Sequence, residues 1–333
     1  MEFTQILDAF RSLGGTAENI QLLNGSYGRG LAPIKRNLPV NIYVPFNLLP
    51  DFESVALDKS EQLRINSNLS LNSKFVSFYE NYQKYFGWGY GGLIAEQSHQ
   101  DRLDKLPRGI KDILLILGWT QADFDKKSAN QYLNSYLVSR KIRIGDTSKL
   151  MPIIELLNHS HHGANFLIDR GIKITGFFKD EILVNYHNSL DSFHFLKNYR
   201  FFSPTTTTIS CDVEIKVSDT LSIKISRFDQ LSEITSNTKI PKVERQDNLI
   251  KISYLEISNK TNPNEPKNCF NALLQPYAIK SEVINSVFEG LIDHNHKILT
   301  ELVKQCNLSP AGLSNQILHT AQDVLQALDK TAK

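Results

Sequence analysis

The spacing of hydrophobic residues predicts a chain of short strands and amphipathic helices. Apolar residues recur every three or four positions from Phe3 to Leu13, which predicts a helix that ends at Gly14-Gly15. Aliphatic runs at residues 20–23 and 40–45 predict two strands, with a glycine-rich turn between them. The N-terminal part therefore combines one helix with small β-elements.

Residues 50–145 interrupt this strand pattern and are predicted to be mostly helical. Aromatic residues recur at helical spacing from Phe75 to Phe86, which predicts a helix with a buried aromatic face. Further helices are expected at Ile110–Leu117 and Asp123–Gly145. The run Gly87–Gly92 has the glycine spacing of a dinucleotide loop, but no aliphatic strand precedes it, so we exclude a dinucleotide site there.

The stretch from Leu150 to Phe202 carries the densest polar and aromatic signals. An apolar run containing Glu155 ends in a polar cluster, residues 158–165, and strands are predicted at 166–168, 172–175 and 182–186. An isolated Asn-His pair is typical of a capped turn, because polar groups at a core edge need partners. Here the pair is followed by an acidic pair, an aliphatic strand and tyrosines, so a functional site is the better interpretation.

The pattern of the residues after Phe202 predicts strands followed by helices. Strands are expected at residues 205–208, 209–217 and 221–225, with a hairpin turn at Ser218-Asp219, and another pair within 243–258. Amphipathic helices are expected at Glu282–Gln305 and Gly312–Leu328.

Length and charge limit the class of protein. A chain of 333 residues is long enough for two lobes. The net charge of +2 provides no basic arm, so no nucleic-acid partner is expected. The apolar runs are far shorter than a membrane span, and the start lacks the pattern of a secretory leader, so we expect a cytoplasmic protein without a membrane partner. The three cysteines form no CxxC pair, so neither a metal site nor a disulfide framework is expected.

The order of these motifs resembles the SET-domain methyltransferases, and among them the branch of the Rubisco large-subunit methyltransferase. The resemblance rests on Asn158–Ser160, on Tyr186 after the acidic pair Asp180-Glu181, and on Tyr199–Phe201. The Gly-x-Gly loop Gly28–Gly30 resembles the first motif of that family. The absence of a cysteine cluster is in keeping with this branch.

The resemblance implies a set of site residues. The catalytic residues would be Tyr186 and Tyr199. The residues that bind S-adenosyl-L-methionine would be Tyr27, Gly28, Arg29, Arg140, Asn158, His159, Tyr186 and Phe201, with Tyr27 and Arg29 acting through their backbone alone. The residues beside the acceptor would be Ser139, Glu155 and Tyr199.

The resemblance also implies a fold and a function. The expected class is α+β, with a SET domain of small curled, β-clip-like sheets and a threaded Asn-His-Ser loop in residues 1–203. A helical insert would occupy about 50–145, and a mostly helical lobe with a few strands, residues 204–333, would bind the protein substrate. The implied activity is S-adenosylmethionine-dependent protein-lysine methylation. Protein-histidine methylation and a catalytically silent SET module that binds a protein partner are the alternatives.

Overall fold

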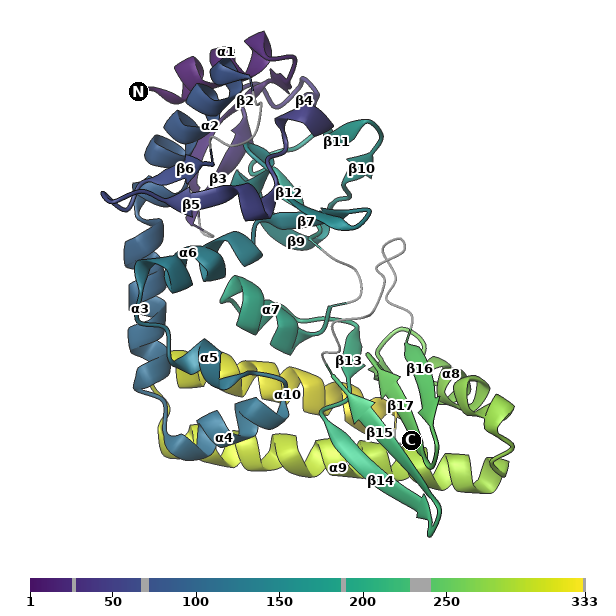
Figure 1. Cartoon of the computed structure of the whole chain (residues 1–333). Helices are drawn as coiled ribbons and strands as arrows, with labels where there is room; N and C mark the ends of the chain where they lie inside the picture. Colours follow the sequence, from purple (N-terminus) through teal and green to yellow (C-terminus); the bar gives the residue numbers. More distant parts are fainter. Residues whose placement is uncertain (26–27, 67–71, 187–189, 228–240, 332–333) are drawn as a thin grey trace. The chain divides into compact units, whose positions relative to one another are not determined.

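The computed structural model describes residues 1–25, 28–66, 72–186, 190–227 and 241–331, and the chain divides into two compact units (Figure 1). The first unit is Met1–Ser98 with Lys126–Asn188, and the second is His99–Asp125 with Ser189–Lys333. Each unit has a hydrophobic core of its own. Residues 99–125 and 189–203 thus belong to the second unit, and the division into domains at residue 203 stays a prediction.

The largest sheet of the first unit is antiparallel and has the strand order β1-β4-β11-β10. Its strands are β1 (Thr16–Glu18), β4 (Val40–Pro45), β10 (Leu167–Ile168) and β11 (Gly171–Gly176). Side chains alternate between the two faces of a strand, so Val40, Ile42 and Val44 all point into the core. The strands predicted at 40–45 and 172–175 are confirmed and are direct neighbours.

Pairs of short strands complete the β-structure of the first unit. They are β2 (Ile20–Gly25) with β3 (Gly28–Pro33), β5 (Val55–Leu57) with β6 (Leu63–Ile65), β7 (Lys141–Ile144) with β8 (Thr147–Leu150), and β9 (Asn158–Ala164) with β12 (Leu183–Val184). Together with the helices, these small sheets confirm the expected α+β class.

The helices at the start of the first unit pack through aromatic rings. They are α1 (Phe3–Ser12) and α2 (Ser73–Phe86). The next helix, α3 (Gly92–Asp104), begins in this unit, and its residues from His99 on belong to the second unit. The ring of Phe10 lies 5.6 Å from that of Phe78, and Phe78 lies 6.1 Å from Tyr82. The predicted aromatic face of α2 is therefore confirmed as part of the core.

The prediction of one long helix at Asp123–Gly145 is wrong. The chain forms α5 (Gln121–Phe124), a new helix α6 (Ala129–Val138), and then the hairpin β7–β8. Ser128 and Gln131 form a reciprocal capping box, which starts α6 by pairing the first backbone N–H groups of the helix. Gly145 has a φ of 58°, a left-handed conformation that suits glycine and turns the hairpin.

The second unit contains another four-stranded sheet, of order β14-β15-β17-β16, and a separate pair, β13 with β18. These strands are β13 (Thr207–Ile209), β14 (Val213–Ser218), β15 (Leu221–Ser226), β16 (Lys242–Gln246), β17 (Leu249–Ser253) and β18 (Glu256–Asn259). The hairpin predicted at Ser218-Asp219 is confirmed by the β14–β15 pairing. Isoleucines from β15 and β17 point into the core of this unit.

Helices cover the core of the second unit. They are α4 (Arg108–Ile116), α5, α7 (Ser192–Tyr199), α8 (Glu265–Leu274), α9 (Ser281–Leu308) and α10 (Leu313–Thr331). The long helices α9 and α10 pack side by side (Figure 1) and confirm the two C-terminal helices predicted from the sequence. Within the described ranges, no helix combines the length and the apolar character needed to cross a bilayer.

Candidate functional site

The polar segment Asn158–Ala164 is a strand rather than the expected loop. It forms β9 and pairs in parallel with β12, and the backbone N–H of Asn185 donates to the Ala164 carbonyl at 2.9 Å. The two strands approach unusually closely at Gly163, where a Cβ atom would lie 2.5 Å from the Val184 carbonyl carbon. Only glycine fits at this distance, so Gly163 makes the close crossing of β9 and β12 possible.

Hydrogen bonds fix the orientation of the Asn158 amide. Its Nδ2 group donates to Glu181 Oε1 at 2.6 Å and to the Arg29 carbonyl at 3.3 Å. A carboxylate only accepts hydrogen bonds, so the NH₂ end must face Glu181. The Oδ1 atom of Asn158 is therefore the end that remains to accept a hydrogen bond from a ligand.

Gly30 makes room for the pair of Asn158 and Glu181. A Cβ atom at Gly30 would lie 2.3 Å from Glu181 Oε1 and 2.8 Å from Asn158 Nδ2. The sequence resemblance did not assign a role to Glu181 or Gly30. An acidic residue just before a strand and a glycine in a turn are the signals that pointed toward them.

His159 is a buried, neutral imidazole that is held against Tyr186. The residue is 8% exposed, and its Nδ1 atom accepts a hydrogen bond from the Tyr186 backbone N–H at 3.2 Å. Burial lowers the pKa of His159 to about 4, helped by the charge of His161 and opposed by a hydrogen bond with the Val184 backbone. The His159 ring lies 4.7 Å from that of His161 and 5.1 Å from that of Tyr186.

The Tyr186 hydroxyl points back to the residue that precedes Asn158. It donates to the Leu157 carbonyl at 2.6 Å. The chain reaches Leu157 through a tight turn, in which the Ile154 N–H donates to the Pro152 carbonyl at 2.8 Å and Ile153 has a φ of 68°. A β-branched residue rarely adopts this conformation, and such strained turns cluster at functional sites. No pattern in the sequence predicted this turn.

Arg140 lies just beyond the C-cap of α6 rather than inside a helix. Its guanidinium stacks 3.6 Å above the Tyr136 ring, and Nη1 donates to the Tyr136 carbonyl at 2.9 Å and to Ser139 Oγ at 2.7 Å. Burial alone would lower the pKa of Arg140, but interactions with Tyr136 and Glu155 outweigh it and leave that pKa raised. The predicted Ser139-Arg140 pair thus forms one hydrogen-bonded unit.

Glu155 is anchored to α2. Its Oε1 atom accepts from Gln83 Nε2 at 2.8 Å, and Gln83 Oε1 accepts from the Trp88 N–H at 3.0 Å. Burial raises the pKa of Glu155, although the positive charge of Arg140 acts against this shift. The role of Glu155 beside an acceptor stays a prediction.

Other predicted site residues belong to the second unit, are placed by their backbone alone, or fall outside the described ranges. Tyr27 is outside the described residues, and Gly28 has a φ of 89°, which requires glycine. Tyr199 and Phe201 belong to the second unit, where their ring centroids are 6.2 Å apart and burial raises the pKa of Tyr199 to about 12. The roles proposed for them stay predictions, whereas Arg29, Asn158, His159 and Tyr186 are linked in the first unit.

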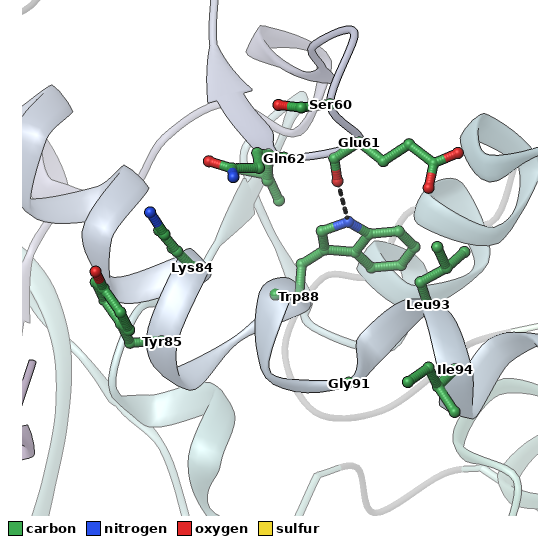
Figure 2. A pocket seen from close by; sticks show the side chains of 11 residues that line it. Ser60, Glu61, Gln62, Lys84, Tyr85, Trp88, Gly91, Leu93 and Ile94 are labelled. Carbon is green, nitrogen blue, oxygen red and sulfur yellow. Dashed lines mark hydrogen bonds between the residues drawn. The ribbon is translucent and has the colours of Figure 1, made fainter.

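A separate surface pocket of about 410 Å³ also lies in the first unit (Figure 2). It is lined by the β5–β6 turn, the end of α2, the short helix Trp88–Tyr90 and the start of α3. Trp88 is one of the residues that line it, and its Nε1 donates to the Glu61 carbonyl at 2.9 Å. The described residues that line it include none of those predicted for the site.

Comparison with known proteins gives a match at the level of solved structures alone. Neither the protein-family models nor the curated proteins match the chain. Similar structures include Rubisco LSMT bound to AdoMet, with a TM-score of 0.45 and 11% identity over 99% of this chain and 90% of that chain. The SET domain of LSMT bound to lysine and AdoHcy has a TM-score of 0.41 and 11% identity over 99% of this chain and 89% of that chain.

Proposed function

We propose that this protein is an S-adenosylmethionine-dependent protein methyltransferase of the SET type that acts on lysine side chains. The observation that carries the proposal is the meeting of Asn158, His159 and Tyr186 where β9 pairs with β12. These are residues at which the sequence resembles the family motifs. The resemblance was based on the order of these residues along the chain. Their proximity in the folded protein was not used for it and therefore supports the proposal independently.

The surroundings of Asn158 suit the amino-acid end of S-adenosylmethionine. Asn158 Oδ1 is oriented to accept from an ammonium group, because Nδ2 already donates to Glu181 and to the Arg29 carbonyl. The Arg140 guanidinium would bind the carboxylate through charge-assisted hydrogen bonds. His159 would hold the purine part, and the proposal that Phe201 packs on the adenine rests on the sequence resemblance alone. When bound, the cofactor supplies an activated methyl group.

Tyr186 would act at the reacting atoms. Its hydroxyl and the Leu157 carbonyl lie 2.6 Å apart, which places two oxygen atoms where weak C–H···O contacts can hold a methyl group in line. The acceptor must be a neutral amine. Desolvation of a lysine amine lowers its pKa, and the proposal that Tyr199 orients the amine rests on the sequence resemblance alone.

The size of the second unit supports a protein substrate. Residues 204–333 contribute most of a separate hydrophobic core, and a single lysine side chain needs far less surface. We propose that these residues recognise the protein that carries the target lysine.

The proposal is tested by incubating the protein with labelled S-adenosylmethionine and a cell lysate, followed by mass spectrometry of the labelled residue. Label on lysine is the expected result, and label on histidine would replace the lysine assignment. Binding of S-adenosylmethionine without any transfer to protein would instead favour a silent module, and absence of binding would refute the proposed function.

Tyr186→Phe is the matching variant test. It should retain cofactor binding within a few-fold but lose roughly 100-fold or more in transfer, because one positioned polar contact contributes about 3 kcal/mol to the barrier. Tyr43→Phe is the control, since the Tyr43 hydroxyl donates to the Arg170 carbonyl at 3.1 Å on an exposed part of the same unit. Equal activity of both variants would remove Tyr186 from its role.

A further inference from the structure

The side chain of Arg29 carries an unused hydrogen-bond donor in a buried position. Nη2 donates to the Phe86 carbonyl, and the guanidinium stacks 4.1 Å above the Tyr90 ring. Nη1 is buried and has no hydrogen-bond partner in the described part of the chain. A buried charged donor without a partner is costly, so such a group calls for an explanation, often a bound water, ion or ligand.

Arg29 and Arg140 are both coupled electrostatically to the same two residues. Both guanidinium groups interact electrostatically with Glu155 and with Tyr136. Arg140 also interacts with Glu96, whereas Arg29 forms no ion pair among the residues that the structure describes. Glu155 Oε1 accepts from Gln83, whereas Glu155 Oε2, like Arg29 Nη1, is buried and has no hydrogen-bond partner in the described part of the chain, so the two side chains are not bonded to each other there.

The chemistry beside Arg29 selects the kind of anion. The Arg29 carbonyl accepts from Asn158 Nδ2 at 3.3 Å, so the Asn158 amide, with Oδ1 left as acceptor, is bonded to the Arg29 backbone. Cationic donors next to a neutral acceptor suit a zwitterionic amino acid, whose carboxylate meets the guanidinium groups while its ammonium meets the amide oxygen. A phosphate would leave the amide oxygen without a donor.

We propose that the Arg29 side chain, together with Arg140, binds the carboxylate of the methyl donor. This inference rests on the proposed function and extends it, because the sequence resemblance gave Arg29 a backbone contact alone. Arg29 Nη1 would bond one carboxylate oxygen and Arg140 the other. The aromatic ring under each guanidinium would hold it in place, so little side-chain freedom is lost on binding.

The test is calorimetric binding of two ligands that differ in the carboxylate. One is S-adenosylhomocysteine and the other is 5′-(3-aminopropylthio)-5′-deoxyadenosine, which keeps the amine and lacks the carboxylate. Arg29→Met should weaken binding of the first about tenfold or more, since a charged hydrogen bond is lost. It should leave binding of the second within about twofold, or tighten it, because a positive charge near the amine is removed.

Matched variants separate the possible outcomes. Arg143→Met removes an exposed arginine from β7 and should change neither affinity, whereas Arg140→Met should weaken binding of S-adenosylhomocysteine. Equal loss for both ligands in Arg29→Met, or no loss for either, would overturn the inference while leaving the proposed function intact. If the wild-type protein binds neither ligand, the proposed function fails, and the inference fails with it.

A conservative variant covers the case in which Arg29→Met does not fold. Arg29→Lys keeps the charge but loses the planar fork, so it should give an intermediate loss that is restricted to S-adenosylhomocysteine. Failure of both Arg29 variants to fold would assign Arg29 a structural role through Phe86 and Tyr90 and would overturn the inference.

Discussion

Asp191 joins distant parts of the second unit and offers a quantitative test of its stability. It is fully buried at the N-cap of α7. Oδ1 accepts from the His194 N–H at 3.0 Å and contacts His194 Nδ1 at 2.9 Å. Oδ2 accepts from the Ile209 N–H at 3.2 Å and from the guanidinium of Arg227, which is 1% exposed.

Asp191→Asn keeps the shape of this side chain and removes its charge. Arg227 is then left as a buried cation without its carboxylate, and breaking a buried ion pair from one side costs about 3–5 kcal/mol. This is a large fraction of the roughly 5–15 kcal/mol that stabilises an ordinary domain. We therefore expect a clear loss of unfolding free energy in the second unit.

The pH dependence gives a second, independent signature. The Arg227 guanidinium and the hydrogen bonds with His194 outweigh the effect of burial and hold the pKa of Asp191 well below its usual range. A carboxyl group with a depressed pKa stabilises the folded state above its unfolded pKa of about 4 and loses this contribution as the pH falls. Asp191→Asn should therefore flatten the fall in stability below about pH 4.

The two tryptophans allow each unit to be followed by itself. Trp88 lies in the first unit and Trp119 lies buried in the second. In a Trp88→Phe background, urea unfolding monitored by Trp119 fluorescence reports the unfolding of the second unit alone. The unfolding of two units is then not analysed as one transition.

An exposed ion pair provides the control. Lys216 Nζ lies 2.8 Å from Asp219 Oδ1, with side-chain exposures of 65% and 98%. Asp219→Asn should therefore cost less than about 1 kcal/mol. If Asp191→Asn lowers the unfolding free energy by no more than Asp219→Asn, the buried ion pair does not stabilise this unit and the reasoning is refuted.

Two further predictions concern the first unit. Gly163→Ala places a Cβ atom 2.5 Å from the Val184 backbone, so it should lower stability by about 1–3 kcal/mol and weaken binding of S-adenosylmethionine, both measurable by calorimetry. The control is Gly290→Ala in α9, where nothing lies within 4 Å of the added Cβ atom, and this change should raise stability by about 0.5–1 kcal/mol. If the two substitutions change stability equally, the close contact at Gly163 does not limit that position to glycine. The pKa of His159 is lowered to about 4, so the folded protein binds fewer protons than the unfolded one between that value and about 6.5. Stability of this unit should therefore fall as the pH drops through that window, followed by Trp88 fluorescence in a Trp119→Phe background, and His159→Asn should remove most of this slope.

The sequence determined the local elements of this protein. The spacing of apolar residues located α1, α2, α9 and the strand β4, because periodicity directly reflects which face of an element is buried. The apolar spacing led to a wrong prediction at Asp123–Gly145 for a local reason. Helical spacing masked the capping box of Ser128 and Gln131 and the glycine turn at Gly145, although both signals stand in the sequence.

The motif residues could also be named from the sequence, but their partners could not. Asn158 donates to a carboxylate 23 residues away and to a carbonyl 129 residues away. No local pattern indicates which acidic residue reaches an amide, since that depends on how β3, β9 and β12 come together. For the same reason, the sequence resemblance implied only a backbone contact for Arg29.

Tertiary structure alone decided the close crossings that shape the site. Gly30 and Gly163 stand in turn-rich or polar stretches in which glycine is common, and only the folded chain brings Glu181 and Val184 against them. Hydrophobic periodicity is a property of neighbouring residues, so it survives in the sequence. Hydrogen-bond partners and steric limits between distant segments arise when the strands pair, and they determine which side-chain atoms remain to bind a ligand.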